Sequence, residues 1–151
     1  MKQRFVKILA IAVLNALALG VAHAQANRGC TNATVQGTFA YTSTGAIIKP
    51  PEIAGPVAEV GTQTFDGNGG TAATAMLSSN GTILPLTMTG SYKVNSDCTG
   101  TARLQVLTPF QAEIDVYFVI DSGGDGFQGM ETNDGFVITR VARRLFPGRA
   151  I

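Results

Sequence analysis

The sequence predicts an all-β domain, an eight-stranded antiparallel up-and-down barrel that follows a cleaved helical signal peptide. Apolar and polar residues alternate strictly over 84–121, and clusters of Gly, Asn and Asp recur at short intervals. No helical period follows the first two dozen residues. Alternation with one polar face is typical of antiparallel strands. It also fixes their register, because a slip by one residue would turn the apolar face to water.

The N-terminal residues predict export. Three basic residues precede a mostly apolar run over 8–21, and Ala22-His23-Ala24 supplies small residues where a signal peptidase cleaves. We therefore expect a signal peptide over 1–24 and a single β-barrel domain over 25–151, secreted or periplasmic. No later apolar run is long enough to span a bilayer.

Removing the leader changes the charge balance. The remaining chain keeps eight basic and ten acidic residues, so its formal charge is 8 − 10 = −2. This balance gives no basic surface for nucleic acid. The only histidine, His23, leaves with the leader. No pattern indicates a cofactor.

Two cysteines remain, Cys30 and Cys98, and in an oxidising compartment we expect them to form one disulfide. A metal or nucleophilic role is less favoured, because neither residue has a histidine to work with. The bond would close a long loop and stabilise the fold by about 4 kcal/mol.

Turn signals divide the chain into eight expected strands. Closure of the sheet would remove both of its edges. An Asn80-Gly81 turn would pair Leu77 with Leu84, and we further expect Tyr92 to pair with Ala102 and Leu107 with Glu113. The strands are expected near 34–43, 57–65, 71–78, 84–94, 100–107, 113–121, 126–131 and 136–144.

One expected connection, 44–56, is long in a protein of tight turns. Ile47, Ile48 and Ile53 would be costly to leave in water. A lid over the barrel mouth and a loop or extra strand on the outer wall both remain open.

Two registers remain open for the second expected strand. In one, Glu59, Gln63 and Phe65 share the inner face, and a desolvated Glu59 could act as a general acid or base. The other register buries residues 58, 60, 62 and 64, and it is slightly favoured.

The last hairpin poses the same choice. One register pairs Gly129 with Arg140 and places Glu131 and Arg140 inside. The other buries Met130, Val137, Thr139 and Val141. We favour the second, because desolvating an ion pair can cost more than its attraction returns. In the first, Arg140 would be a natural anchor for a ligand carboxylate.

The sequence gives little support for a metal site or for a serine nucleophile. Asp66, Asn68, Asp121 and Asp125 supply oxygen atoms at one expected end of the barrel, but turns alone explain them, so we expect no metal site. No activated serine is apparent.

Several segments carry a resemblance: Gly37-Thr38-Phe39-Ala40-Tyr41, residues 61–69, residues 90–101, and the closing residues 137–144. They resemble a family of small exported bacterial proteins, and the pattern is similar to the allene-oxide-cyclase-like barrels of the calycin type. The resemblance implies an eight-stranded barrel with an interior cavity. No catalytic motif can be transferred residue by residue.

The predicted interior suggests a function. Alanines at 73, 75 and 102 and glycines at 61 and 90 are small for a filled core, which favours a cavity. We expect a small hydrophobic ligand inside. The alternatives are a cyclase- or isomerase-like enzyme using Glu59 in the same cavity, and a structural domain with a filled core. The lining is expected to comprise Phe39, Tyr41, Phe65, Leu86, Met88, Tyr92, Leu104, Val116 and Phe118, and the ligand-pocket candidates are Phe39, Tyr41, Glu59, Gln63, Phe65, Met88, Tyr92, Phe118 and Arg140.

Overall fold

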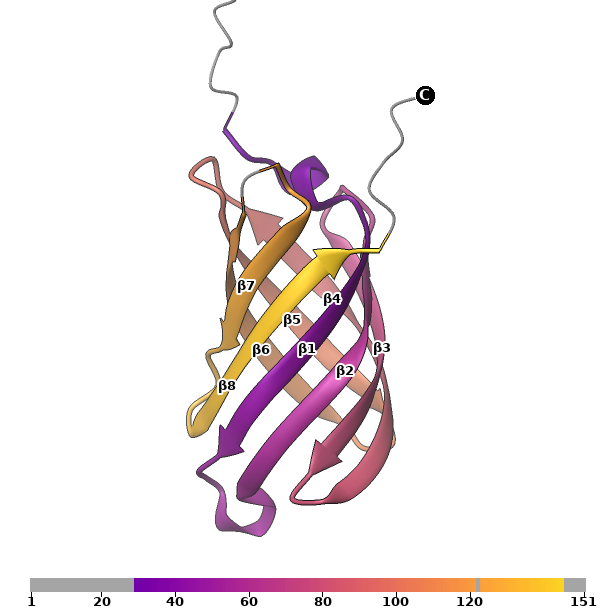
Figure 1. The fold of residues 1–151 in the computed structure, drawn as a ribbon, viewed down its shortest axis with the longest axis vertical. Helices are drawn as coiled ribbons and strands as arrows, with labels where there is room; N and C mark the ends of the chain where they lie inside the picture. Colours follow the sequence, from indigo (N-terminus) through magenta and orange to yellow (C-terminus); the bar gives the residue numbers. More distant parts are fainter. Residues whose placement is uncertain (1–28, 122, 146–151) are drawn as a thin grey trace, which may run out of the picture.

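A computed structural model describes residues 29–121 and 123–145, and the expected signal peptide lies outside them. Eight antiparallel strands follow one another around a closed barrel, in chain order (Figure 1). The fold class predicted from the alternation is confirmed. The strands are β1 (Gly37–Ile47), β2 (Gly55–Phe65), β3 (Gly70–Ser79), β4 (Thr82–Val94), β5 (Thr99–Thr108), β6 (Ala112–Ile120), β7 (Gly126–Glu131) and β8 (Phe136–Arg144).

The expected hairpin registers are confirmed in two cases and wrong in one. Leu77 pairs with Leu84, and Tyr92 pairs with Ala102. Glu113, however, pairs with Gln105 rather than with Leu107. The error is two residues, so every side chain of this hairpin keeps its face, because side chains alternate with a period of two.

The first two strands are longer at one end than expected. β1 continues to Ile47 and β2 begins at Gly55, so the connection shrinks to 48–54 and holds one turn of 3-10 helix, η2 (Pro51–Ile53). Ile48 and Ile53 are 62% and 48% exposed. The proposed lid is therefore not formed, because strand pairing absorbs most of the loop.

Aromatic rings fill the half of the barrel nearest the start of β1 and the end of β8. The Phe39 and Phe65 rings meet edge to face with their centroids 5.7 Å apart, and Phe127 lies 5.5 Å from Phe39. Edge-to-face geometry is the favoured arrangement for such pairs. All nine residues expected to line the interior are buried.

This end of the barrel is sealed. A 3-10 helix, η1 (Asn32–Val35), lies across it with Val35 fully buried, as the coil near the N-terminus in Figure 1 shows. The Asn32 side chain accepts a hydrogen bond from the Val94 amide at 2.8 Å. The predicted Cys30–Cys98 disulfide is confirmed, with Cα atoms 4.9 Å apart. We call this end the disulfide end.

Among the described residues, no segment plugs the opposite end. Its last inward-facing side chains belong to the strands themselves and are only half-buried: Ile47, Leu77, Leu84, Ala112, Ile114 and Phe136. Exposed apolar residues follow: Ile48, Ile53 and Phe110 in the connections, and Ile83 near the start of β4. We call this end the apolar end. Within the described ranges, no helix has the length and apolar character needed to cross a membrane.

Candidate functional site

A charged and polar cluster lies inside the barrel at mid-height. It is built on three neighbouring strands, because Arg140 on β8 pairs with Ser43 on β1, and Ser43 pairs with Glu59 on β2. Since paired residues point to the same face, all three side chains enter the interior. Arg140 is 2% exposed and Glu59 is 7% exposed.

Arg140 is the centre of this cluster. Its Nε donates to Ser43 Oγ at 3.0 Å, and its Nη1 donates to Gln63 Oε1 at 3.3 Å. Its Nη2 lies 3.6 Å from Glu59 Oε2 and makes no hydrogen bond with the described residues. The guanidinium also stacks on the Tyr41 ring, 4.2 Å from its centroid.

Tyr41 and Gln63 extend the network to either side. The Tyr41 hydroxyl donates a short hydrogen bond to Glu59 Oε1. Burial raises the pKa of Tyr41 far above its usual range; Arg140 opposes this, and Glu59 adds to it. Gln63 Nε2 donates to Thr71 Oγ1 at 3.1 Å.

Glu131, at the end of β7, is a second buried carboxylate facing the same cation. It is 5% exposed. Burial raises its pKa to about 7, against the attraction of Arg140 and with the repulsion of Glu59. One cation and two carboxylates therefore share the interior, an arrangement typical of functional sites.

These positions correct two expectations. The register that buries residues 58, 60, 62 and 64 is wrong, since Val60 is 60% exposed while Glu59 and Gln63 are inside. The favoured register for the last hairpin is also wrong: Gly129 pairs with Arg140, and Met130 and Val137 are 48% and 60% exposed. The hydrogen bonds that Arg140 donates to Ser43 and Gln63, which lie far from it in the sequence, offset part of the desolvation cost.

The interior is filled rather than hollow. The cavity beside this cluster measures about 10 Å³ and is lined by Arg140, Gln63, Ala102, Val116 and three phenylalanines. That is room for about one water molecule. Two of the five small residues expected to leave space are instead places of close packing: a Cβ added to Gly61 would meet Ala75, and one added to Gly90 would overlap the Arg103 carbonyl oxygen.

The remaining pocket candidates contribute to this filling. Phe39, Phe65, Met88 and Phe118 are at most 2% exposed. Tyr92 meets Phe65 edge to face and donates through its hydroxyl to the Asn32 carbonyl at 3.0 Å, which joins the core to η1. The nine candidates thus fall into an aromatic and apolar group and a polar group around Arg140.

Outside the barrel, an apolar groove crosses β1–β4 next to the apolar end. Its volume is about 380 Å³. Val60 pairs with Met76 across β2 and β3, and Ile83 pairs with Ser78 across β3 and β4, so these side chains share the outer face. Exposed fractions of 60%, 47% and 59% for Val60, Met76 and Ile83 leave a continuous apolar surface.

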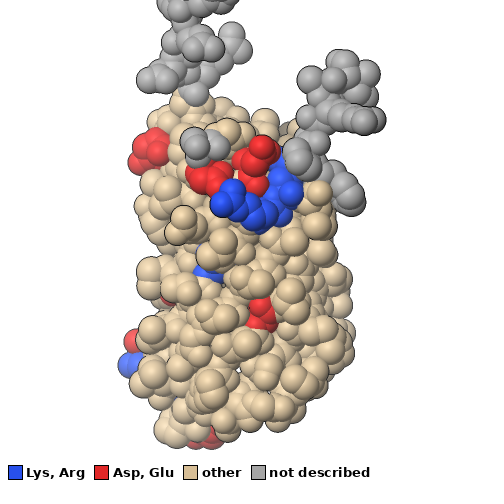
Figure 2. All heavy atoms as spheres, viewed as in Figure 1, with Lys and Arg blue, Asp and Glu red and all other residues tan. Residues whose placement is uncertain are grey.

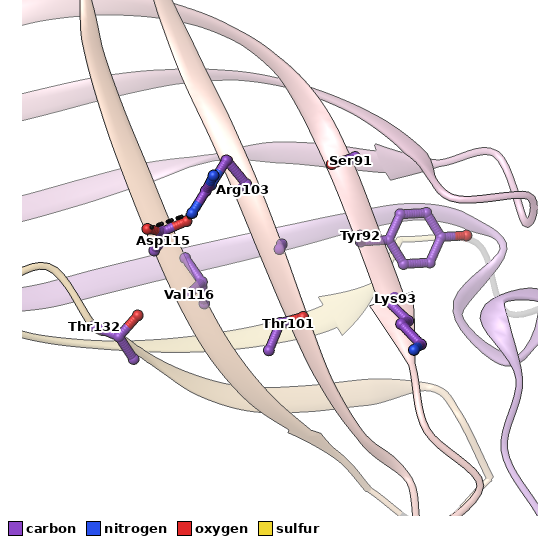
Figure 3. Close-up of a pocket in the computed structure, with 9 residues that line it drawn as sticks. Ser91, Tyr92, Lys93, Thr101, Arg103, Asp115, Val116 and Thr132 are labelled. Carbon is purple, nitrogen blue, oxygen red and sulfur yellow. Dashed lines mark hydrogen bonds and ion pairs between the residues drawn. The ribbon is translucent and has the colours of Figure 1, made fainter.

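A second groove, of about 490 Å³, crosses the outer face of β4–β6 and reaches the residue after β7. Figure 3 shows Lys93, Arg103, Asp115 and Thr132 around it, with Arg103 bonded to Asp115. The Arg103 Nε donates to Asp115 Oδ1 at 2.8 Å. Its lining is polar, unlike that of the first groove.

Charge is distributed unevenly over the surface. The only charged residue within β1–β3 is Glu59, which points inward, so the outer wall there is uncharged. In Figure 2 the facing wall is mostly uncharged, with an acidic patch in its lower half, and the largest group of visible charges lies at the disulfide end. The ion pairs of Arg143 with Asp121 and Arg144 with Asp125 belong to that end.

The acidic turns have structural roles. Asp66 Oδ1 accepts backbone hydrogen bonds from Asn68, Gly69 and Gly70, which lower its pKa. Asp121 and Asp125 pair with arginines. In the part of the chain that the structure describes, no group of three acidic, histidine or cysteine side chains is placed to hold a metal ion.

Sequence reasoning missed Ser43 and the residues of the apolar groove. Val60, Met76 and Ile83 would have been found from the correct register, because each then faces outward, next to a wall of β1–β3 whose only charged residue, Glu59, points inward. Ser43 has no local signal; its role depends on Arg140, 97 residues away.

Comparison with known proteins adds no relative: a scan of family models, a search of curated proteins and a search of solved structures all find no match.

Proposed function

We propose that this chain is an exported binding module for a small, mainly hydrophobic molecule, held in the apolar groove across β1–β4. The observation that carries the proposal is the groove itself: about 380 Å³ of concave surface whose exposed side chains include Val60, Met76 and Ile83. This volume lies in the range of small-molecule sites, which are mostly apolar. Apolar patches that stay exposed on a monomer commonly mark binding sites.

Export is part of the proposal. It is supported by the basic and apolar leader and by the disulfide, a bond that forms and persists in oxidising compartments. The resemblance to allene-oxide-cyclase-like barrels is likewise a proposal. The closed eight-stranded topology supports it, and no transferable motif does.

The groove is preferred to the interior as the place for the ligand. A ligand inside the barrel would have to displace core side chains, since the cavity there has a volume of only about 10 Å³. The alternative of a cyclase- or isomerase-like enzyme keeps its named residue, because Glu59 faces inward. The cavity inside the barrel, beside Arg140, is too small for a substrate.

Two methionines of matched exposure provide the test. Met76 lies in the groove and is 47% exposed, whereas Met130 lies outside it on β7 and is 48% exposed. The measurement is titration of the wild type, Met76→Glu and Met130→Glu with an uncharged naphthalene fluorophore. Circular dichroism checks that each variant is folded.

A charge in the groove should weaken binding of the fluorophore at least about tenfold in Met76→Glu, equivalent to ~1.4 kcal/mol. Met130→Glu should bind as the wild type does. Equal affinities for the three proteins, or no binding to any of them, would contradict the proposal.

A further inference from the structure

β7 is the least-paired strand of the barrel. It has five residue pairs with β6 and five with β8, whereas the other seams have between eight and eleven. Fewer cross-strand pairs mean less stabilisation of the seam. Local opening of this barrel should therefore begin at β7, since regions with few stabilising contacts open first.

Glu131 lies at the end of this seam. It forms the last β6–β7 pair, with Val116, and the next backbone bond runs from the Thr132 amide to the Asp115 carbonyl at 2.8 Å. Although Glu131 is 5% exposed, its carboxylate accepts no hydrogen bond from the described residues. Solvent still reaches the carboxylate, because neither of its oxygens is a fully buried atom without a partner; packing and charge supply its other interactions.

The charges that face Glu131 come from two strands. Arg140 on β8 attracts its ionised form, and Glu59 on β2 repels it. Tyr41 on β1 is within electrostatic reach but is neutral near physiological pH, because its pKa is raised. On β6, Asp115 pairs with Arg103 on the outer face. Arg140 already donates hydrogen bonds to Ser43 and Gln63 and forms an ion pair with Glu59, so Glu131 shares this cation with other partners.

We propose that Glu131 is a proton-controlled latch of the β6–β7 seam. When it is protonated, the interior holds one cation and one anion and the seam stays closed. When it ionises, two carboxylates share one cation in a nearly dry interior, and the end of β7 separates from β6. Burying a carboxylate without adequate pairing costs much more desolvation free energy than burying a neutral carboxyl group.

Opening at this point would have a consequence for access. Asp115, Val116 and Thr132 line the polar outer groove, so the groove lies directly over the end of the seam (Figure 3). Separation there would connect the groove to the buried cluster, where Arg140 Nη2 has no hydrogen-bond partner. Burial places the pKa of Glu131 at about 7, so the latch would respond near neutral pH.

Amide hydrogen exchange tests the latch. NMR protection factors, corrected for the intrinsic pH dependence of exchange, are compared at pH 5.5 and 8.5. The reporter is the Thr132 amide and the reference is the Thr74 amide on β3, far from the seam. In the wild type, Thr132 should lose at least tenfold in protection relative to Thr74 at the higher pH.

Two glutamine variants make the test specific. Glu131→Gln should abolish the change at Thr132. Glu113→Gln, on the outer face of β6, should retain it. Equal behaviour of the wild type and Glu131→Gln would overturn the proposal, as would unchanged protection in the wild type.

A second measurement needs no variant. Carbon-13 carboxyl shifts of the wild type report each titration directly, and Glu131 should titrate between pH 6 and 8 if its environment is as described. Titration near 4.5, the ordinary value for a glutamate, would overturn the latch. Both measurements are independent of whether the apolar groove binds a ligand.

Discussion

Arg140 is the side chain on which the buried cluster depends. It joins β8 to β1 through Ser43 and to β2 through Gln63 and Glu59. Its removal would leave Glu59 and Glu131 desolvated without a counter-charge. Breaking a buried pair in this way costs much more than the pair itself contributes.

We therefore expect Arg140→Ala to lower the free energy of unfolding by about 3–5 kcal/mol in urea denaturation. Arg103→Ala is the matched control, because that arginine makes its ion pairs on the exposed outer wall. Exposed pairs are worth ~1 kcal/mol or less. Similar losses for the two variants would show that Arg140 has no special role.

The ionisation of Glu131 should make the stability of the fold depend on pH. Its pKa is raised from 4.5 to about 7 by burial, so the folded state holds a proton that the unfolded state has released. The associated stability is fully present below pH 4.5 and is lost as pH rises through 7. A shift of this size corresponds to ~3 kcal/mol.

Glu131→Gln should thus be more stable than the wild type at pH 8.5, by up to ~3 kcal/mol, and similar to it at pH 4.5. Urea denaturation at the two pH values measures both differences. A wild type whose stability rises between these pH values relative to that of the variant would show that the sign is wrong.

At the scale of strands and turns, the alternation in the sequence was enough to locate all eight strands. It worked best for β4 and β5, most of whose apolar residues fall on the inner face, with Ile83 and Leu107 among the exceptions. It failed for β2, β7 and β8, because Val60, Met130 and Val137 are apolar but outward-facing, while Glu59, Glu131 and Arg140 are charged but inward-facing.

The reason for this failure is physical. Hydrophobic patterning assumes that charge is excluded from the core, and the barrel satisfies its buried charges through contacts between residues far apart in the chain. Arg140 meets Gln63 across 77 positions. No local pattern records such a contact, so the candidate site was predicted as a set of residues but not as a cluster.

The contribution of the disulfide to the stability of the fold can be measured. It joins the N-terminal segment to the β4–β5 turn across 68 positions. Cys30→Ser with Cys98→Ser should lower the free energy of unfolding by about 4 kcal/mol, chiefly by freeing the unfolded chain. Comparison of urea midpoints gives the value. An unchanged midpoint would mean that η1 and its contacts hold this end without the bond.

Gly90 on β4 provides a test of close packing. A Cβ at this position would overlap the backbone carbonyl oxygen of Arg103 on β5, which cannot move as a flexible side chain could. Gly90→Ala should therefore destabilise the fold by about 1–3 kcal/mol. The outward-facing neighbour Ser91→Ala should have little effect, and a Gly90→Ala protein as stable as the wild type would contradict the packing described.

For the whole molecule, the main feature is that the two ends of the barrel differ in charge and in exposed apolar surface, and that its interior differs from its outer wall. The disulfide end is sealed by η1 and surrounded by ion pairs, while the apolar end exposes isoleucines and adjoins the apolar groove. The interior is packed around a charged cluster. We therefore propose that binding takes place on the outer wall and that the interior contributes stability and its control.

Ligand binding in the apolar groove is tested most directly by native mass spectrometry of protein purified from its own compartment. The wild type and Met130→Glu should each retain a small apolar molecule at one per chain, and Met76→Glu should be free of it. Retention of the same mass by Met76→Glu, or its absence from all three proteins, would contradict a binding site on the wall of β1–β4.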